Sequence, residues 1–231
     1  MNNLQQIMVA SLQPYAPIKY KFTNQSLQMD MAGSPLSIRE NEFEFLKKYI
    51  IINNLKTGFE LGTGFGISTA AIGLGFRRTG GHLISMDAYT EEKFQSYEYV
   101  ASNKDVYRDA IGYKSAKFLM KELELENTVD IVCGWSPTDI PTILKPYLQQ
   151  SRQLDFVFID AMHNDESVMN DLTAIFPFMS KKFVLFLHDV HCFSQSTKDH
   201  IKSLFGKIYA VIPSCSLDIG LGYNLAIVNR L

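Results

Sequence analysis

Short, nearly continuous apolar runs recur along the chain and alternate with segments that have helical spacing of apolar positions. We expect buried strands at residues 57–61, 82–86, 128–133, 154–159 and 183–187. We expect helices at residues 68–76, 165–179 and 197–205. Strands that alternate with helices predict a mostly parallel sheet covered on both faces, so the fold class is a doubly wound, Rossmann-like α/β domain.

The two ends of the chain depart from this alternation. Residues 208–212 and 223–228 are predicted strands joined by a link too short for a crossover helix, so the last strand should pair antiparallel with its predecessor. Residues 1–36 are mixed and are predicted to be a short helix or an irregular arm. A helix is expected to begin after Ser37, because Glu40 follows three residues later as in a capping box.

The domain organisation follows from these elements. We expect an N-terminal arm over residues 1–36 and one domain over residues 37–231, with an insertion at residues 88–127 between the second and third strands. The insertion is rich in tyrosine and contains Tyr89, Tyr97, Tyr99, Tyr107 and Tyr113. Two interpretations stay open: extra surface helices with tyrosines at their packing edges, or a wall that faces the substrate.

Composition excludes several classes of protein. The chain has 231 residues and a net charge of −2 without a long basic run, so nucleic acid is not an expected partner. No apolar stretch approaches the roughly 20 residues that a membrane span needs, and the N-terminus lacks the pattern of a signal peptide. The three widely spaced cysteines indicate neither a disulfide framework nor a zinc cluster. A reducing, cytoplasmic location is therefore expected.

The glycine-rich segment at residues 59–66, which reads F-E-L-G-T-G-F-G, is the strongest indication of chemistry. Glycines this dense mark a sharp turn or close contact of the backbone with a ligand. A dinucleotide-binding loop reads G-x-G-x-x-G, but Ile67 stands at the third glycine position here. Glu60 precedes the glycines, where it would repel a pyrophosphate and favour a ligand with an ammonium and a sulfonium.

Asp87 ends the strand that follows the glycine-rich segment. A carboxylate at this position, about twenty residues past the loop, can accept hydrogen bonds from both ribose hydroxyls. This role suits NAD and S-adenosylmethionine alike. Asp87 therefore indicates a nucleoside without identifying it.

These residues resemble the class I S-adenosylmethionine-dependent methyltransferases. The resemblance rests on the glycine-rich segment with Ser68-Thr69, on Asp87, and on the segments Phe158-Ile159-Asp160 and Phe186-Leu187-His188-Asp189. The chain is most similar to small-molecule O-methyltransferases and the related cephalosporin-hydroxylase-like group (methyltransferase family 24-like). In that group one strand reads F-I-D-G-D-H and a later strand ends H-D. The resemblance runs from about Pro35 to the C-terminus.

The resemblance implies S-adenosylmethionine as the cofactor and indicates the residues that bind it. Glu60, Gly62 and Gly64 would contact its amino-acid part and Asp87 its ribose. Trp135 and Ser136 would border the adenine, with Trp135 offering a stacking face, although Trp135 could equally be an ordinary core aromatic. The implied cofactor-binding set is Glu60, Gly62, Thr63, Gly64, Gly66, Ser68, Asp87, Trp135, Ser136 and Asp160.

A second constellation follows the fourth and fifth strands and contains Asp160, His163, His188, Asp189 and His191. In metal-dependent relatives, a divalent ion at this place lowers the pKa of the substrate hydroxyl. By position, Asp160, His188 and Asp189 would be the ligands of Mg²⁺ or another divalent cation. His188 replaces a carboxylate of the catechol-type enzymes, which favours a softer ion or none.

Without a metal, a histidine could act as general base on the acceptor hydroxyl, because its pKa lies near neutrality. The candidates are His163 and His188, and Asp160 lies near both the methyl group and the substrate. The catalytic candidates are therefore Asp160, His188 and His163. Met162 replaces the second acidic residue of the F-I-D-G-D-H pattern.

The sequence predicts an enzyme that methylates a hydroxyl of a small molecule. Two other hypotheses stay open: a nucleotide-binding oxidoreductase, and a non-catalytic module that retains the cofactor pocket. Aromatic residues in the N-terminal arm would be compatible with a homodimer.

Overall fold

The computed structural model of the protein describes residues 20–22, 26–29, 35–89, 111–149, 153–205, 208–212 and 225–230. The chain divides into two units, each built from two separate stretches of sequence. Unit 1 comprises Met1–Asn54 and Thr63–Cys133. Unit 2 comprises Leu55–Gly62 and Gly134–Leu231. The glycine-rich segment therefore begins in unit 2 and ends in unit 1.

Unit 1 begins with a small antiparallel sheet. Its strands are β1 (Tyr20–Phe22), β2 (Ser26–Met29) and β3 (Pro35–Arg39), and β2 pairs with both neighbours. The remaining elements are α2 (Glu40–Ile52), α3 (Ile67–Thr79), β5 (His82–Asp87), α5 (Ile111–Glu122) and β6 (Val129–Cys133). Strands β5 and β6 run parallel, with Leu83 opposite Val129 and Asp87 opposite Cys133.

Small residues on α3 set the packing of unit 1. A Cβ on Gly75 would lie 2.9 Å from the Cβ of Ile50 on α2, so the two helices approach closely only because the glycine lacks one. Gly80 ends α3 in the left-handed conformation with φ 69°, as a C-terminal glycine commonly does.

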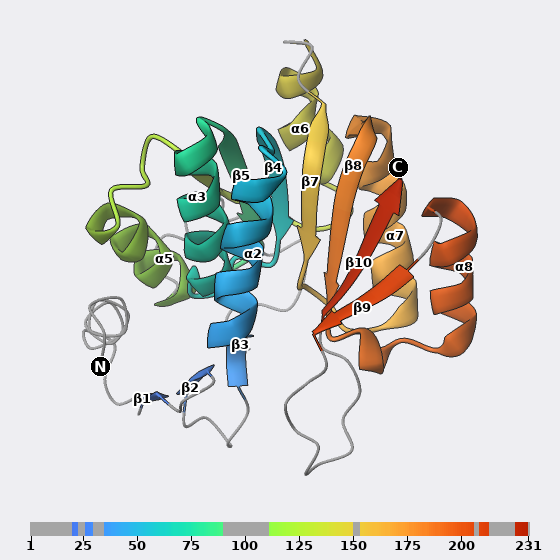
Figure 1. The fold of residues 1–231 in the computed structure, drawn as a ribbon, viewed down its shortest axis with the longest axis horizontal. Helices are drawn as coiled ribbons and strands as arrows, with labels where there is room; N and C mark the ends of the chain where they lie inside the picture. Colours follow the sequence, from blue (N-terminus) through green and yellow to red (C-terminus); the bar gives the residue numbers. More distant parts are fainter. Residues whose placement is uncertain are drawn as a thin grey trace. The chain divides into compact units, whose positions relative to one another are not determined.

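Unit 2 contains the larger group of strands, in the order β4-β7-β8-β10-β9. Its elements are β4 (Thr57–Leu61), α6 (Ile140–Gln149), β7 (Leu154–Ile159), α7 (Asp165–Ile175), the 3₁₀ turn η3 (Phe176–Phe178), β8 (Met179–His188), the 3₁₀ turn η4 (Val190–Cys192), α8 (Gln195–Phe205), β9 (Ile208–Ile212) and β10 (Leu225–Arg230). Strands β4, β7 and β8 are parallel, and β10 is antiparallel to β8 and β9. Figure 1 shows α7 and α8 beside these strands.

Phenylalanine dominates the core of unit 2. Phe59, Phe156, Phe158 and Phe186 on the parallel strands are all fully buried, and the rings of Phe156 and Phe186 lie 5.6 Å apart. Burying side chains of this size supplies the main hydrophobic stabilisation of a sheet. A well-packed sheet in turn fixes where its strands end, which is where the polar candidates lie.

The α/β class predicted from the sequence is confirmed, because parallel strands alternate with helices in both units. The strands predicted at 57–61, 154–159 and 208–212 match β4, β7 and β9 at both ends. Among the helices of the described residues, none combines the length and apolar character that crossing a membrane requires.

Several local predictions were wrong. Ser37 lies within β3 rather than at a helix N-cap, because this segment pairs with β2, and α2 begins at Glu40. The described parts of the N-terminal arm are strands, not helix or irregular chain. Helix α7 ends at Ile175, four residues earlier than predicted, and α6 was not foreseen. Some predictions lie outside the described residues, namely those for Tyr97, Tyr99, Tyr107 and the turn at residues 213–222.

Candidate active site

The part of the glycine-rich segment in unit 1 is held by buried hydroxyls. The Oγ1 of Thr63 lies 2.6 Å from the Oγ of Ser85 on β5, and the Gly66 N–H donates to the Thr63 carbonyl at 2.8 Å. Gly66 is the N-cap of α3 with φ 88°, a conformation that favours glycine. Thr63 therefore stabilises the turn with its side chain, and Ser68 is buried in the first turn of α3.

The turn is tied directly to the carboxylate of Asp87 at the end of β5. The Gly64 N–H donates to Oδ2 of Asp87, and the Tyr89 N–H donates to Oδ1, each at 2.8 Å. Two backbone donors thus fix the orientation of the carboxylate. A carboxylate oxygen can accept more than one hydrogen bond, so ligand hydroxyls can bind to the same carboxylate.

Helix α5, which lies in the predicted insertion, packs against the same turn. A Cβ on Gly112 would lie 3.0 Å from the Gly64 carbonyl oxygen, and one on Gly66 would lie 2.9 Å from the Cα of Ala116. The ring of Tyr113 on α5 meets that of buried Tyr89 edge-on, with centroids 5.3 Å apart. The described part of the insertion therefore supports the glycine turn.

In unit 2, the first glycine of the segment meets the end of β7. Gly62 has φ +99°, and a Cβ there would lie 2.0 Å from the carbonyl oxygen of Asp160. The Asp160 N–H donates to the Leu61 carbonyl at 2.8 Å, which extends the pairing of β4 with β7. Glu60, the last acidic residue before the glycines, is fully buried. The absence of a side chain at Gly62 is what permits this approach.

Strands β7 and β8 bring the second set of polar candidates together. They are parallel with Ile159 opposite Leu187, so Asp160 and His188 come next on neighbouring strands. The Nδ1 of His188 lies 3.1 Å from Oδ1 of Asp160 and 3.3 Å from Oδ2 of Asp189. His188 is 7% exposed, so its imidazole lies inside the protein against both carboxylates.

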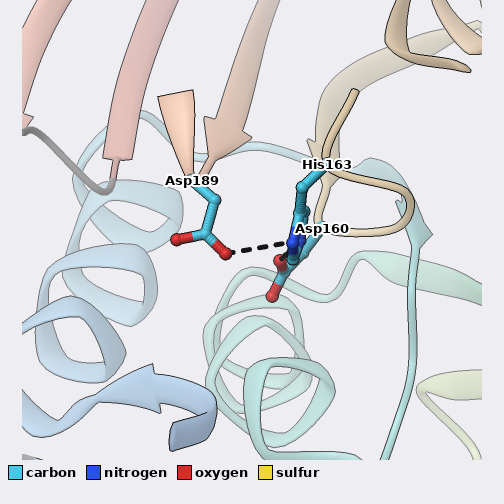
Figure 2. A group of neighbouring side chains, drawn as sticks. All are labelled: Asp160, His163 and Asp189. Atoms are coloured by element: carbon cyan, nitrogen blue, oxygen red, sulfur yellow. Dashed lines mark hydrogen bonds and ion pairs between the residues drawn. The ribbon is translucent and has the colours of Figure 1, made fainter. Parts of the chain in front are cut away.

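His163 approaches the same two carboxylates from the loop after β7 (Figure 2). Its Nε2 lies 3.2 Å from Oδ1 of Asp160 and 3.3 Å from Oδ2 of Asp189. The side chain of His163 is 42% exposed, whereas that of His188 is 8% exposed, so His163 is the histidine that a substrate can reach. We call Asp160, His163, His188 and Asp189 the strand-end cluster.

The charges in the strand-end cluster stabilise one another. Burial alone would raise the pKa of the Asp160 carboxyl, but the imidazoles of His188 and His163 outweigh it and hold that pKa well below its ordinary value. Burial would also raise the pKa of the Asp189 carboxyl, but the hydrogen bond and charge of His188 outweigh burial, so this pKa is lowered. The hydrogen bond to Asp160 raises the pKa of His163 against partial burial, and the charge of Asp189 acts in the same direction.

One subset of the cluster has the spacing of a metal site. Asp160, His163 and Asp189 offer ligand atoms that all lie within 4.8 Å of one another. This subset contains His163, whereas the sequence suggested His188 for the same role. His191 lies further out, with its Nδ1 3.8 Å from Oδ1 of Asp189. Met162, between Asp160 and His163, is 65% exposed.

The segment predicted to border an adenine is also held by carboxylates. The Trp135 N–H donates to Oδ2 of Asp139 at 2.8 Å, and the Ser136 hydroxyl donates to Oδ1 of Asp171 on α7. Asp171 is 3% exposed, and burial raises its pKa to about 6 while the bond from Ser136 opposes the shift.

Asp139 and Asp171 were missed at the sequence level. Asp171 did leave a signal, since it lies among buried Val168, Leu172 and Ile175 at helical spacing. An acidic residue on an apolar helix face needs a polar partner, but the helical pattern does not identify Ser136 as that partner.

Comparison with known proteins adds an independent observation. The family described as a methyltransferase domain matches residues 59–190, which is more than half of the chain and includes both the glycine-rich segment and the strand-end cluster. Among curated protein sequences, none matches this one.

Solved structures with the same fold cover nearly the whole chain. Cofactor-bound Rv0187 from MTB has a TM-score of 0.65 and 14% identity, over 100% of this chain and 91% of that one. The tomaymycin-synthesis O-methyltransferase TomG from Streptomyces achromogenes, in complex with SAM, has a TM-score of 0.63 and 14% identity, over 97% and 88%.

The O-methyltransferase from Bacillus cereus, in complex with SAH, has a TM-score of 0.58 and 15% identity, over 98% of this chain and 89% of that one. At such low identity, these likenesses support the fold. The family match does not favour the oxidoreductase considered from the sequence. Because the match extends over more than half of its length, the chain belongs to the methyltransferase-domain family.

Proposed function

We propose that this protein is an S-adenosylmethionine-dependent methyltransferase that methylates a hydroxyl of a small molecule. The observation that carries the proposal is the strand-end cluster, in which an accessible histidine lies within 3.3 Å of two carboxylates directly after β7 and β8. Such a group can take a proton from an acceptor hydroxyl, which methylation of oxygen requires. The O-methyltransferases of the same fold that bind SAM or SAH support this assignment.

The residues around the glycine turn fit the proposed cofactor. Buried Glu60 places a negative charge before Gly62, which suits an ammonium and a sulfonium and opposes a pyrophosphate. The Asp87 carboxylate is oriented by two backbone N–H groups and can still accept bonds from ribose hydroxyls. When bound, the cofactor supplies an electrophilic methyl group on sulfur.

The residues of the strand-end cluster divide the work of the reaction. His163 would take up the proton that the acceptor hydroxyl loses when its oxygen is methylated. Asp160 and Asp189 stabilise the imidazolium that results, because each has an oxygen within 3.3 Å of its Nε2. His188, almost fully buried, holds the two carboxylates in place through its Nδ1. Alignment of the two reactants provides much of the remaining acceleration.

A divalent cation is a second way to activate the same hydroxyl. Two carboxylates and an imidazole, with ligand atoms within 4.8 Å of one another, fit a transition metal such as Mn²⁺ or Zn²⁺ better than Mg²⁺, which prefers oxygen ligands alone. Asp160, Asp189 and either His163 or His188 would hold the ion. It would lower the pKa of the acceptor hydroxyl.

Calorimetric titration with S-adenosylhomocysteine tests the cofactor assignment. We expect binding in the micromolar range, and no binding by NADH in the same buffer. A folded protein that shows no heat with millimolar S-adenosylhomocysteine would contradict the proposal. Binding of the cofactor product without methyl transfer to any of a panel of phenols, catechols and hydroxy acids would instead support the non-catalytic module.

The metal is tested separately. Methyl transfer is measured before and after treatment with EDTA, and again after Mg²⁺, Mn²⁺ or Zn²⁺ is added. Loss of turnover that one ion restores would support a metal at the cluster. Unchanged turnover would leave His163 as the group that takes the proton.

A further inference from the structure

Helix α7 carries a buried carboxylate that the proposed reaction does not use. Asp171 lies on the inner face of α7, between Val168 and Ile175, and is 3% exposed. Desolvating a carboxylate is costly unless a cation or several hydrogen bonds replace the lost water. Among the described residues, its polar partner is the hydroxyl of Ser136, and no cation accompanies it.

Asp171 holds a short segment, residues 134–136, which contains Trp135. Ser136 follows Gly134 and Trp135 directly after β6, and Gly134 is buried. The preceding residue, Trp135, is held by Asp139, whose Oδ2 accepts from the Trp135 N–H at 2.8 Å. One carboxylate from α7 and one from the turn before α6 therefore hold Ser136 and Trp135, and the indole of Trp135 is half-buried.

The same helix also begins at the strand-end cluster. Asn164, the residue after His163, caps α7 by accepting from the Ser167 N–H at 2.9 Å. Asp171 comes two turns later on this rigid element. A displacement of α7 would thus move the attachment of Ser136 and the loop that carries His163 together.

We propose that Asp171 is a positioning residue for the cofactor, because its carboxylate fixes the Ser136 hydroxyl and thereby the 134–136 segment, which the sequence predicts to border the adenine. This inference rests on the proposed function. It explains why the helix retains a carboxylate on its apolar face, where a leucine would pack at lower cost. Asp171 would act through Ser136 and would not touch the reacting atoms.

The experiment compares four single variants of the full-length protein and the double variant Asp171→Ala/Ser136→Ala. Asp171→Ala removes the acceptor, Asp171→Asn keeps an oxygen that can accept from Ser136, and Ser136→Ala removes the donor. Glu166→Gln is the matched control, since it removes one negative charge from an exposed position on the same helix. The affinity for S-adenosylhomocysteine is measured by calorimetry. Fluorescence of Trp135, the single tryptophan of the chain, reports on the segment itself.

We expect Asp171→Ala and Ser136→Ala to weaken S-adenosylhomocysteine binding about tenfold each, the effect of losing one hydrogen bond to a charged group. The double variant should be no worse than either single one, because both remove the same bond. Asp171→Asn should recover most of the affinity, and Glu166→Gln should match the wild type. The emission maximum of Trp135 should shift in the alanine variants only, and the KM for the acceptor should change less than that for S-adenosylmethionine.

Several outcomes would overturn the inference. It fails if Ser136→Ala and Asp171→Ala bind S-adenosylhomocysteine as the wild type does, or if the two effects add in the double variant. It also fails if the melting temperature falls while affinity and Trp135 emission stay unchanged, which would make Asp171 purely structural. If Asp171→Ala does not fold, Ser136→Ala decides alone. Absence of binding to the wild type contradicts the proposed function and removes the inference with it.

Discussion

Asp87 is the last residue of β5 and Asp160 directly follows β7, yet the two carboxylates have different surroundings. Asp87, in unit 1, accepts hydrogen bonds from the backbone N–H groups of Gly64 and Tyr89. Asp160, in unit 2, faces the imidazoles of His163 and His188. Backbone donors cannot change their protonation state, whereas imidazoles titrate near neutrality. One carboxylate is therefore built as a fixed receptor and the other as part of a proton-handling group.

The largest expected effect comes from substituting Asp160, the carboxylate that faces the two imidazoles. Asp160→Asn removes the charge that stabilises the imidazolium of His163, so methyl transfer should fall about 10³-fold in kcat. The measurement is turnover under saturating S-adenosylmethionine. The matched control is Asp130→Asn, since Asp130 pairs with His82 at 2.9 Å on unit 1 outside the strand-end cluster. Similar losses in both variants would contradict a special role for Asp160.

Two glycines test how each carboxylate is supported by the backbone. Gly62→Ala should destabilise the protein by about 4 kcal/mol, because φ is +99° and the new Cβ would overlap the Asp160 carbonyl. Gly64→Ala should cost only about 1–2 kcal/mol, because φ is +51° and its Cβ would meet no heavy atom within 4 Å among the described residues. Urea denaturation measures both. Equal costs would show that the contact between Gly62 and Asp160 is not tight.

Asp171 offers a third carboxylate, held by neither backbone donors nor imidazoles. Its folded pKa of about 6 lies above the ordinary value of 3.8, so the folded state binds its proton more tightly. The stability it contributes is therefore present below about pH 4 and is lost as the pH rises to about 6. A shift of this size corresponds to about 3 kcal/mol, so Asp171→Asn should be more stable than the wild type at pH 7.5 by up to that amount.

Urea denaturation of both proteins at pH 4.5 and pH 7.5 checks this prediction. The advantage of Asp171→Asn should be smaller at the lower pH, where the wild-type carboxyl is mostly protonated. An advantage that does not depend on pH would mean that the pKa of Asp171 is not raised.

The smallest expected effect is a change in pH dependence that comes from His163, and its direction is clearly defined. Its pKa is raised above 6.5, so its contribution to stability is complete below that pH and is lost as the pH rises through the folded pKa. A general base must be neutral, so kcat in EDTA-treated enzyme should rise through the same pKa. Asp189→Asn should move this rise to lower pH, because the charge of Asp189 helps to raise the pKa. A rise that does not move would exclude His163 as the base.

Much of the fold could be predicted because local sequence decides it. Strand β7 is apolar except for Asp155 and is followed by Asp160, and β4 leads directly into the glycines, so the bounds of both follow from the local pattern. The positions of Asp160 and His188 in unit 2 follow too, since the residues after neighbouring parallel strands gather at one edge. The convergence of Asp160 and His188 could therefore be predicted without coordinates.

The rest depended on contacts between distant segments. Ser37 and Glu40 satisfy a capping box, but pairing of β3 with β2 decides the conformation of Ser37. Helix α6 was missed because Pro146 lies inside it, where proline ordinarily disfavours a helix. The role of Asp171 depends on Ser136, 35 positions away, and no local pattern encodes that partner.

The central claim is that Asp87 holds the cofactor and Asp160 serves the acceptor. Calorimetric titration of S-adenosylhomocysteine into Asp87→Ala and Asp160→Asn tests it most directly. Asp87→Ala should lose about 100-fold or more in affinity, since two hydrogen bonds to a charged group disappear, whereas Asp160→Asn should lose about fivefold at most. A large loss in Asp160→Asn with little change in Asp87→Ala would contradict the account.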